Sequence, residues 1–305
     1  MYLGPLFEET LQSDTYEHGK GGSTVSKVLQ NYRKTHGISG LAGVSNTGSD
    51  INWTGHLFGQ ANWHAFGRLA WNPPDLTAKE ISEEWIRMTF SNDEKLIDAV
   101  QKIMLMSREA AVNYMTPLGL NHIMNYDTHN GPEPWHDDPP VWSAFDYHKA
   151  SESGIGGVDR TESGSNAVGQ YHQPLRGELN DIKTCPDNLL LWFHRVPWDY
   201  RMKSGNTIWN EMVEYYYRGV DEVRQMQEIW NSIEGKIDQE RFDHVKSLLE
   251  LQKGGEAIWW RDGCLLFFQQ YSKQPIPAKY EQPEHSLDYY KRIPYPYDWK
   301  PGQYK

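Results

Sequence analysis

Aromatic and acidic side chains crowd one stretch of this 305-residue sequence, residues 138–161, which reads DPPVWSAFDYHKASESGIGGVDRT. The whole chain carries 13 tryptophans and 18 tyrosines, and Trp135 and Trp142 fall beside or inside this stretch. Aromatic rings stack on flat ligand faces, although most of them simply fill hydrophobic cores. The chemistry that this stretch could supply is therefore stacking, and a sugar ring is a suitable ligand for it.

A neighbouring group of carboxylates and imidazoles has the side chains that metal ions bind. Its members are Asp127, His129, His136, Asp137 and Asp138. Their spacing matches no helical zinc motif, and a proline-rich loop does not preset the geometry of ligands. We therefore expect a hydrogen-bonded loop core here, with no metal and no other cofactor.

The glycine run at residues 153–157 is similar to a phosphate-binding loop only superficially. A dinucleotide fingerprint follows a strand and opens a helix, whereas this run continues into VDRT at residues 158–161. We expect the glycines to form a tight turn, and Asp159 and Arg160 to form a structural ion pair. Nucleophile-elbow, HExxH and P-loop motifs do not occur, and 41 acidic residues offer too many pairs for acid-base catalysts to be chosen by spacing.

These residues lie within a long non-periodic run, from Thr116 to Thr184. Loops of this length inside compact domains are uncommon and are either functional or disordered. Disordered segments are poor in aromatic residues, and this segment is rich in them. The sequence therefore predicts an ordered, functional loop.

The residues before the loop must supply the framework. Leu41–Ser45 reads as a short buried strand, a turn-rich loop follows at residues 46–50, and apolar residues spaced for a helix run from about 54 to 70. Strand, loop and helix in this order form the repeating unit of a parallel α/β protein.

Helix signals dominate from residue 77 onward. Capping-box patterns occur at residues 77–80 (TAKE) and 91–94 (SNDE), and Ile81, Trp85 and Met88 are spaced for one buried face. A long helix is predicted over about 206–231, and Asp238 is placed to cap another. Gly254-Gly255 interrupts that last helix, where we expect a kink or a tight contact with another helix.

Composition excludes several classes of function. A net charge of −11 without basic blocks disfavours binding to nucleic acid or to a membrane surface. Hydrophobic runs are too short to span a membrane, and the first residues lack a signal-peptide pattern. Cys185 and Cys264 are far apart, so two buried free thiols are expected. The sequence reads as a soluble protein whose compartment is undetermined.

Five stretches, in order and nearly end to end, carry a resemblance to a known family. They are ISGLAGVSNTGSDINWTG (38–55), QANWHAFGRLAWNPPDLTAKEISEEW (60–85), NYMTPLGLNHIM (113–124), GIGGVDRT (154–161) and TCPDNLLLWFHRVPW (184–198). Together they resemble glycoside hydrolase family 67, the α-glucuronidases that remove 4-O-methylglucuronic acid from xylo-oligosaccharides.

The resemblance implies a mainly α fold. Members of the family have an N-terminal β-rich domain, a central (β/α)8 barrel, and a C-terminal helical domain that forms much of a homodimer interface. On that template, residues 1–76 hold the last β/α portion of the barrel, and residues 77–305 form the helical domain with its long aromatic loop at 116–184. A lone barrel strand leaves apolar surface and edge groups exposed, so poor solubility or oligomers are expected of the chain alone.

The resemblance also implies an inverting hydrolysis of the α-1,2 bond between (4-O-methyl)glucuronic acid and xylose. A glutamic acid acts as general acid and an Asp/Glu pair activates water. All three positions would precede Met1, so we expect no catalytic residue in this chain and no activity without the barrel part. The alternative is a non-catalytic module that binds carbohydrate or another partner.

The substrate-binding residues that the resemblance implies lie on the lid side of the pocket. Trp142 matches the position from which the helical domain supplies an aromatic wall for the glucuronic acid, and Trp135 is the second choice. Loops after barrel strands face the active site, so Asn46, Asp50 and Trp53 are further candidates, with a fold-stabilising role as the alternative. The expected partners are a glucuronoxylo-oligosaccharide, the barrel part of the enzyme and a second copy of the chain.

Overall fold

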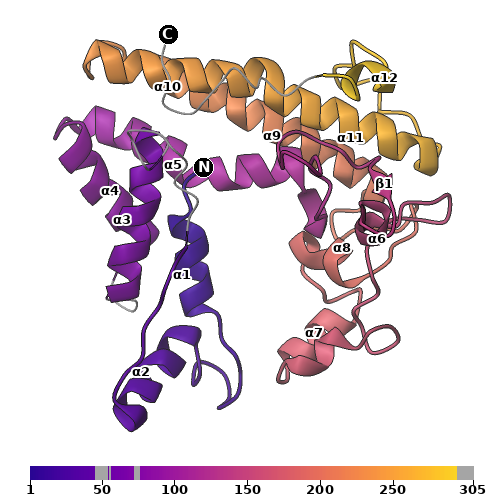
Figure 1. The fold of residues 1–305 in the computed structure, drawn as a ribbon, viewed down its shortest axis with the longest axis horizontal. Coiled ribbons are helices and arrows are strands. Elements are labelled where there is room, and N and C mark those ends of the chain that lie inside the picture. The colour runs from indigo at the N-terminus through magenta and orange to yellow at the C-terminus, as the bar shows by residue number, and fades with distance from the viewer. Residues whose placement is uncertain (45–53, 55, 72–75, 294–305) are drawn as a thin grey trace. The chain divides into compact units, whose positions relative to one another are not determined.

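Helices form most of the protein in the computed structural model, which describes residues 1–44, 54, 56–71 and 76–293. The chain divides into two compact units (Figure 1). Of the described residues, the first unit comprises those within 1–108 together with Gln225–Leu248, and the second comprises Glu109–Arg224 and residues 249–293. The mainly α fold expected from the sequence is confirmed.

The elements follow one another as a series of long helices interrupted by short ones. The long helices are α1 (Gly4–Gln12), α2 (Val25–His36), α3 (Leu57–Trp71), α4 (Ala78–Thr89), α5 (Glu94–Met115), α9 (Ile208–Asn231), α10 (Gln239–Leu251) and α11 (Ala257–Ser272). The short elements are η1 (Pro117–Gly119), β1 (Asp137–Asp138), β2 (Trp142–Ser143), α6 (Phe145–His148), η2 (Ala167–Gln170), α7 (Leu175–Asn180), η3 (Asp187–Leu189), α8 (Leu190–Phe193), η4 (Gln252–Glu256) and α12 (Leu287–Tyr290).

In the first unit, α1, α3 and α4 pack against one another. Helix α3 buries Ala61, Ala65 and Leu69, whose spacing of four residues places them on one face. The chain start is held to α4 by the Tyr2 hydroxyl, which donates to the carbonyl of Ala78 at 3.0 Å. This buried face is the one that the sequence pattern predicted.

Two details of α4 and α5 differ from the prediction. The capping box at Thr77 and Glu80 is present, but α5 is capped by Asp93, whose Oδ1 accepts from the backbone N–H of Leu96 at 2.9 Å. Ser91 lies outside the helix, and its hydroxyl accepts from the N–H of Asp93 instead. Met88 is 67% exposed, because the turn of the helix places Ile86 rather than Met88 beside Trp85 in the core.

The strand predicted at Leu41–Ser45 is not found over its described residues, 41–44, which have no regular secondary structure and are exposed. Ser45 itself lies outside the described residues. A strand is stabilised by backbone hydrogen bonds to a neighbouring strand, and the described part of this unit offers no such neighbour to residues 41–44. The apolar pattern alone was therefore insufficient to form it.

The second unit is built on α9 and α11, with the last turns of α5 crossing α9. Gly219 of α9 makes the crossing close, since a Cβ there would lie 2.5 Å from the backbone nitrogen of Tyr114. Large side chains fill the core around these helices, and Trp209, Tyr216, Trp260 and Phe268 are fully buried. The kink predicted at Gly254-Gly255 takes the form of the π-helical turn η4 between α10 and α11.

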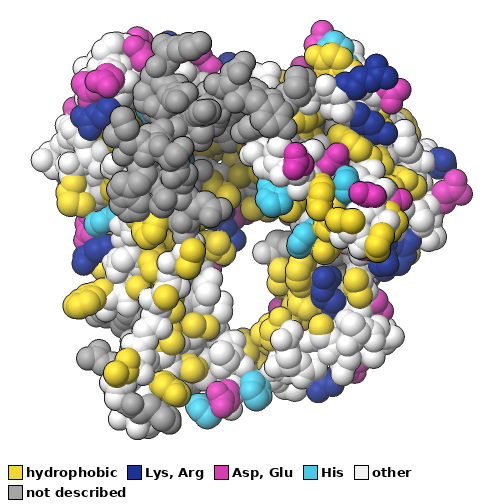
Figure 2. Space-filling model, viewed as in Figure 1, with side chains coloured by type: hydrophobic (Ala, Val, Ile, Leu, Met, Phe, Trp, Pro, Cys, Tyr) yellow, Lys and Arg dark blue, Asp and Glu magenta, His cyan; other side chains and the backbone are white. Residues whose placement is uncertain are grey.

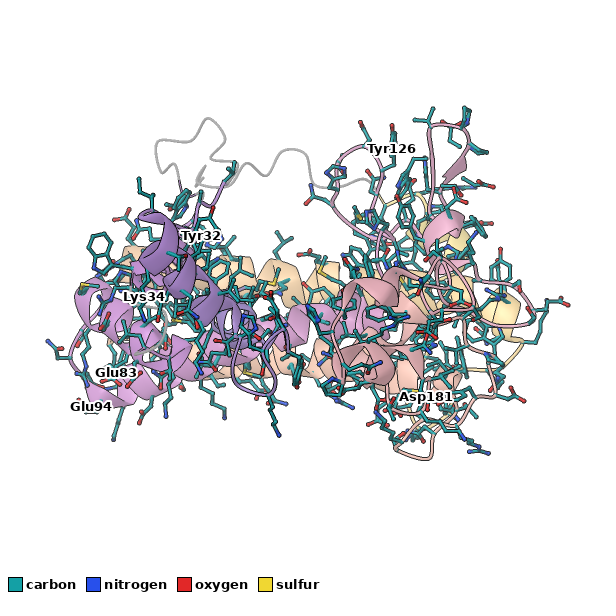
Figure 3. All side chains as sticks on the ribbon, turned by 90° about the horizontal axis from the view of Figure 1, so that it is seen from below. Tyr32, Lys34, Glu83, Glu94, Tyr126 and Asp181 are labelled. Carbon is teal, nitrogen blue, oxygen red and sulfur yellow. The ribbon has the colours of Figure 1, made fainter. Side chains whose placement is uncertain are left out.

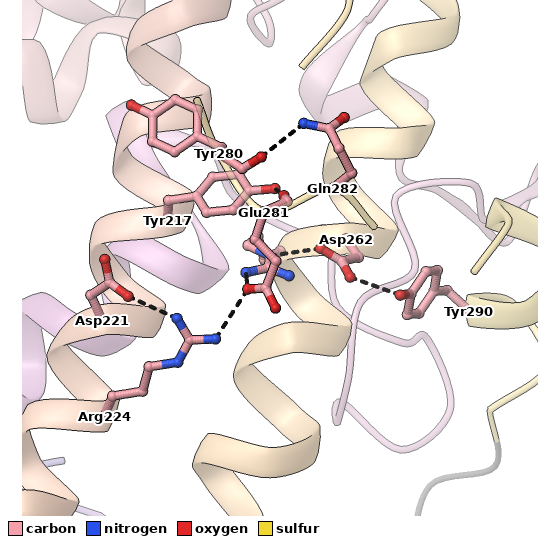
Figure 4. A network of polar contacts seen from close by, with 9 residues as sticks. Tyr217, Asp221, Arg224, Asp262, Tyr280, Glu281, Gln282 and Tyr290 are labelled. Carbon is pink, nitrogen blue, oxygen red and sulfur yellow. Dashed lines mark hydrogen bonds and ion pairs between the residues drawn. The ribbon is translucent and has the colours of Figure 1, made fainter. Parts of the chain in front are cut away.

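A buried ion-pair network ties the C-terminal segment of the second unit to α9 and α11 (Figure 4). Arg261 and Asp262 are 2% and 1% exposed, and their side chains are joined by a hydrogen bond of 2.6 Å. Asp262 accepts a second one, at 2.7 Å, from the Tyr290 hydroxyl. Glu281 accepts from both Arg261 and Arg224. Since Glu281 and Tyr290 follow α11, these bonds hold residues 281–290 against α9 and α11.

The aromatic loop is ordered, as predicted. Between Thr116 and Thr184 it forms η1, the β1–β2 hairpin, α6, η2 and α7, connected by hydrogen-bonded turns. Both cysteines are buried and unpaired, which confirms the prediction of two free thiols. Among the described residues, none of the helices has the length and hydrophobicity needed to span a membrane.

Candidate functional site: an aromatic strip in the second unit

Five aromatic rings of the loop stand next to one another and form what we call the aromatic strip: Tyr126, His136, Trp142, Tyr147 and His122. Figure 3 shows Tyr126 on the part of the loop that extends away from the helices of this unit. On the face drawn in Figure 2, histidine and hydrophobic side chains lie side by side over the second unit.

Three of the rings form a stack at one end of the strip. The Tyr126 ring lies 4.9 Å from His136 and 5.4 Å from Trp142, centroid to centroid, at interplanar angles of 12° and 25°. His136 and Trp142 are themselves 4.9 Å apart. Tyr126 is 40% exposed, and Trp142 is half-buried, so the stack keeps an accessible side.

The other end of the strip is a second stack. Tyr147 lies 6.0 Å from Trp142 and 4.0 Å from His122, with the His122 ring nearly parallel to it at 10°. The Nδ1 atom of His122 is 3.0 Å from the side-chain oxygen of Asn121, which orients the imidazole. Burial lowers the pKa of His122, and the nearby charge of Arg160 lowers it further. His122 is therefore a neutral, flat surface at neutral pH.

A short hairpin determines where Trp142 points. Strand β1 pairs with β2 in antiparallel register, so that Asp138 lies opposite Trp142 and Asp137 lies opposite Ser143. The N–H of Ala144 donates to the carbonyl of His136 at 2.9 Å and continues the pairing. Two short segments separated by residues 139–141 are thus held together, which brings His136 next to Trp142.

Glu133 fixes the turn that carries Tyr126. One carboxylate oxygen accepts from the backbone N–H of Tyr126 at 2.8 Å and from the side chain of Asn125 at 3.0 Å. The same oxygen lies 3.7 Å from Nδ1 of His136. The Nε2 atom of His136 is buried and has no hydrogen-bond partner in the described part of the chain.

The loop is anchored to α11 by tight contacts. Gly131 has φ +73°, and a Cβ on it would lie 2.2 Å from the Trp259 ring. Trp135 also packs inward: its ring meets Phe267 edge-on at 6.3 Å, and Lys291 lies over it at 5.7 Å. Of the two tryptophans considered from the sequence, Trp142 is the one that the strip includes, and Trp135 contacts the helix.

His148 joins the hairpin to the core beneath the strip. Its Nε2 donates to the carbonyl of Pro134 at 2.8 Å, while its Nδ1 accepts from the N–H of Ala150 at 3.0 Å. Only the neutral imidazole can make both hydrogen bonds, because the protonated ring has no nitrogen left to accept one. Burial lowers the pKa of His148 to about 4.

This burial predicts a pH-dependent contribution to stability. As the pH decreases below 6.5, His148 becomes protonated in the unfolded chain, whereas in the folded chain it becomes protonated only near pH 4. The free energy of unfolding therefore decreases as the pH is lowered from 6.5 to about 4. The loss at pH 5 should be about 2 kcal/mol. Urea unfolding at pH 7 and pH 5 should show a smaller pH dependence for His148→Gln than for the wild type. His172→Gln, at an exposed histidine, should keep the wild-type dependence, and an unchanged dependence in both variants would contradict the assignment.

Asp159 and Arg160 do not form the ion pair expected from the sequence. Asp159 accepts from the backbone and hydroxyl of Thr161 and from the hydroxyl of Ser163. Burial would raise its pKa, but these hydrogen bonds outweigh burial and lower it. Arg160 turns the other way, and its Cζ lies 3.9 Å above the Trp192 ring. The two charges thus have different partners: hydroxyl and backbone groups for Asp159 and the Trp192 ring for Arg160.

The remaining residues predicted from the sequence are not brought into the strip. Asn46, Asp50 and Trp53 lie outside the described residues. Within the described ranges, no three His, Cys, Asp or Glu side chains are grouped so that they could hold a metal ion. Tyr126, His136, Tyr147 and His122 were not proposed for stacking from the sequence, because their proximity depends on the hairpin and not on a repeat.

The geometry defines a class: a mainly helical protein with an ordered loop that carries neighbouring aromatic rings. Comparison with known families identifies its family. Residues 54–281 match the model described as "Glycosyl hydrolase family 67 C-terminus", and residues 1–53 match "Glycosyl hydrolase family 67 middle domain". The chain belongs to glycosyl hydrolase family 67.

Curated relatives are similar over most of the chain. Alpha-glucuronidase A of Emericella nidulans is 37% identical over 279 residues, which cover 91% of this chain and 32% of the relative. Probable alpha-glucuronidase A of Aspergillus clavatus is 34% identical over 311 residues, covering 99% and 36%. Alpha-glucuronidase A of Aspergillus tubingensis is 33% identical, covering 91% and 32%. This chain therefore spans about a third of the length of these relatives.

Proposed function

We propose that this chain is the C-terminal portion of an α-glucuronidase and supplies an aromatic wall of its sugar-binding pocket. The observation that supports this most directly is Trp142, which is held by the β1–β2 hairpin in a strip of stacked rings with an accessible side. A pyranose ring has an apolar face, and indole is the largest flat apolar surface that a protein offers to it.

The proposed reaction is hydrolysis of the α-1,2 bond between (4-O-methyl)glucuronic acid and xylose in glucuronoxylo-oligosaccharides. It proceeds with inversion, through one general acid and a carboxylate pair that activates water. In this proposal the three carboxylates belong to a portion of the barrel that this chain does not include. The chain alone binds the sugar and does not cleave it.

The proposed domains are the end of the barrel at residues 1–76 and the helical domain at 77–305. Exposed apolar side chains in the first of these ranges suit contact with further barrel elements: Val28, Tyr32, Ile38, Leu41 and Val44. Asn46, Asp50 and Trp53, which lie outside the described residues, are further sugar-binding residues in this proposal. A homodimer formed through the helical domain is part of the same proposal.

The test is release of 4-O-methylglucuronic acid from aldouronic oligosaccharides. The purified chain should be inactive alone and should support activity when mixed with the barrel portion. In the mixture, Trp142→Ala should lower kcat/KM by about tenfold or more, since truncation of a central aromatic anchor typically costs at least 2 kcal/mol. Trp71→Ala, at a tryptophan that is 89% exposed on α3, should leave the activity unchanged.

Three results would count against the proposal. Activity of the chain alone would show that its own acids are catalytic. Sugar binding without activity in the mixture would favour the non-catalytic module. Equal activities of Trp142→Ala and wild type would show that the strip is not part of the sugar-binding pocket.

A further inference from the structure

The segment that carries Tyr126 rests on one tryptophan of α11. Gly131 is buried, and a Cβ on it would lie 2.2 Å and 2.4 Å from Cη2 and Cζ3 of Trp259, which form the edge of the indole farthest from the backbone. The next residue, Pro132, lies on Gly263, since a Cβ on Gly263 would be 3.4 Å from the proline ring. Trp259 and Gly263 are four residues apart on α11, so one face of this helix supports the segment.

The orientation of Trp259 is fixed by the segment that follows α11. Its indole N–H donates to the backbone carbonyl of Tyr290 at 2.9 Å. Tyr290 is 3% exposed, and its hydroxyl donates to the buried Asp262 at 2.7 Å (Figure 4). Because Tyr290 is bonded to the core through its side chain, its carbonyl has a defined position. The indole of Trp259 therefore cannot turn away from Gly131 without losing this hydrogen bond.

Hydrogen bonds connect Gly131 to Tyr126 across the turn. The N–H of Asn125 donates to the carbonyl of Gly131 at 2.9 Å. The Glu133 carboxylate accepts from the N–H of Tyr126 at 2.8 Å and from the side chain of Asn125 at 3.0 Å. The position of Gly131 on the indole thus determines the position of Tyr126, whose ring lies 5.4 Å from Trp142.

We propose that Trp259 is a positioning residue for the sugar-binding wall and that, through Gly131, it holds Tyr126 against Trp142. A stacking surface binds a ligand more tightly when its rings are already in place, because less conformational entropy is lost on binding. Tyr290 acts in the same way one step further back, since its carbonyl orients the indole. The inference rests on the proposed function of the strip.

Hydrogen exchange of the 305-residue chain, followed by mass spectrometry, tests the positioning without any ligand. Trp259→Phe removes both the indole N–H and the ring edge that faces Gly131. The backbone amides of residues 123–133 should therefore exchange about tenfold faster, while those of α9 keep their wild-type rates. Trp209→Phe is the matched control, because Trp209 lies on α9 and also donates to a carbonyl after α11, that of Pro275 at 3.1 Å. It should leave the exchange of residues 123–133 unchanged.

The affinity for glucuronic acid, measured by ligand-observed NMR, tests the effect on binding. Trp259→Phe should weaken this affinity by about three- to tenfold, whereas Trp209→Phe should leave it unchanged. If Trp259 acts through the strip, its substitution should cause no further loss in a Trp142→Ala background, where the stack is already broken. A general loss of stability would not produce this dependence on Trp142.

Tyr290→Phe perturbs the same support more mildly. It keeps the backbone carbonyl that accepts from Trp259 and removes only the hydroxyl bond to Asp262. The exchange of residues 123–133 should accelerate by a smaller factor than in Trp259→Phe, and the loss of affinity should follow the same order. This variant tests the proposal even if Trp259→Phe does not fold.

The outcomes distinguish the failure of each idea. Unchanged exchange of residues 123–133 in Trp259→Phe and Tyr290→Phe would overturn the positioning role and leave the aromatic wall intact. An equal loss of affinity with and without Trp142, or a similar loss in Trp209→Phe, would show that Trp259 is only a structural residue. Failure of the wild type to bind glucuronic acid would overturn the proposed function itself, and the positioning of a sugar-binding wall with it.

Discussion

Replacement of Asp262 by asparagine is expected to lower the free energy of unfolding by about 3–5 kcal/mol. Asp262 is 1% exposed and accepts from Arg261, which is 2% exposed, and from the Tyr290 hydroxyl. The substitution removes the charge that compensates the buried guanidinium and weakens the bond to Tyr290. Burial and the neighbouring Asp262 carboxylate raise the pKa of Tyr290, so its hydroxyl stays protonated and donating.

Glu281 provides the matched control for this prediction. It contacts the same Arg261 at 3.0 Å, but its side chain is 56% exposed. Water can replace an exposed partner, so Glu281→Gln should cost less than about 1 kcal/mol. Urea unfolding of both variants at pH 7, followed by circular dichroism, measures the difference. Equal losses for the two variants would show that burial does not decide the strength of this network.

Replacement of Gly156 by alanine should destabilise the protein by about 3 kcal/mol or more, because two effects add. Its φ of +117° is unfavourable for a residue with a Cβ, and that Cβ would lie 2.1 Å from the carbonyl oxygen of His194. Both the clashing atom and its neighbours belong to the backbone, so they cannot move aside as a side chain would. Gly156 also donates to the carbonyl of His148, which ties this turn to α6.

Substitution of Gly205 is the control that separates the cost of a positive φ from the cost of the steric clash at Gly156. The φ of Gly205 is +89°, and a Cβ there would meet nothing within 4 Å. Gly205→Ala should therefore cost only the backbone term, about 1–2 kcal/mol. Thermal unfolding of the two variants under one condition compares them directly. A Gly156→Ala protein that is as stable as Gly205→Ala would mean that the close approach to His194 is not required.

Local features of this protein were determined by the sequence. The capping box at Thr77 and the apolar spacing of α3 involve residues three or four positions apart, so the interactions that stabilise them can be read along the chain. The high aromatic content of residues 116–184 predicted that this loop is ordered. The stretches that resemble family 67 indicated the family, and the matches over residues 1–53 and 54–281 confirm it.

The tertiary structure decided where residues distant in the chain meet. Pairing of β1 with β2 brought His136 next to Trp142, and the turn held by Glu133 placed Tyr126 on both rings, which no periodic pattern encodes. The contact with Trp192 drew Arg160 away from Asp159, although the two are adjacent in sequence. Residues 41–44, with an apolar pattern typical of a strand, formed none because a strand depends on backbone hydrogen bonds to another strand. Spacing in sequence thus determined the helices, and long-range packing determined the site.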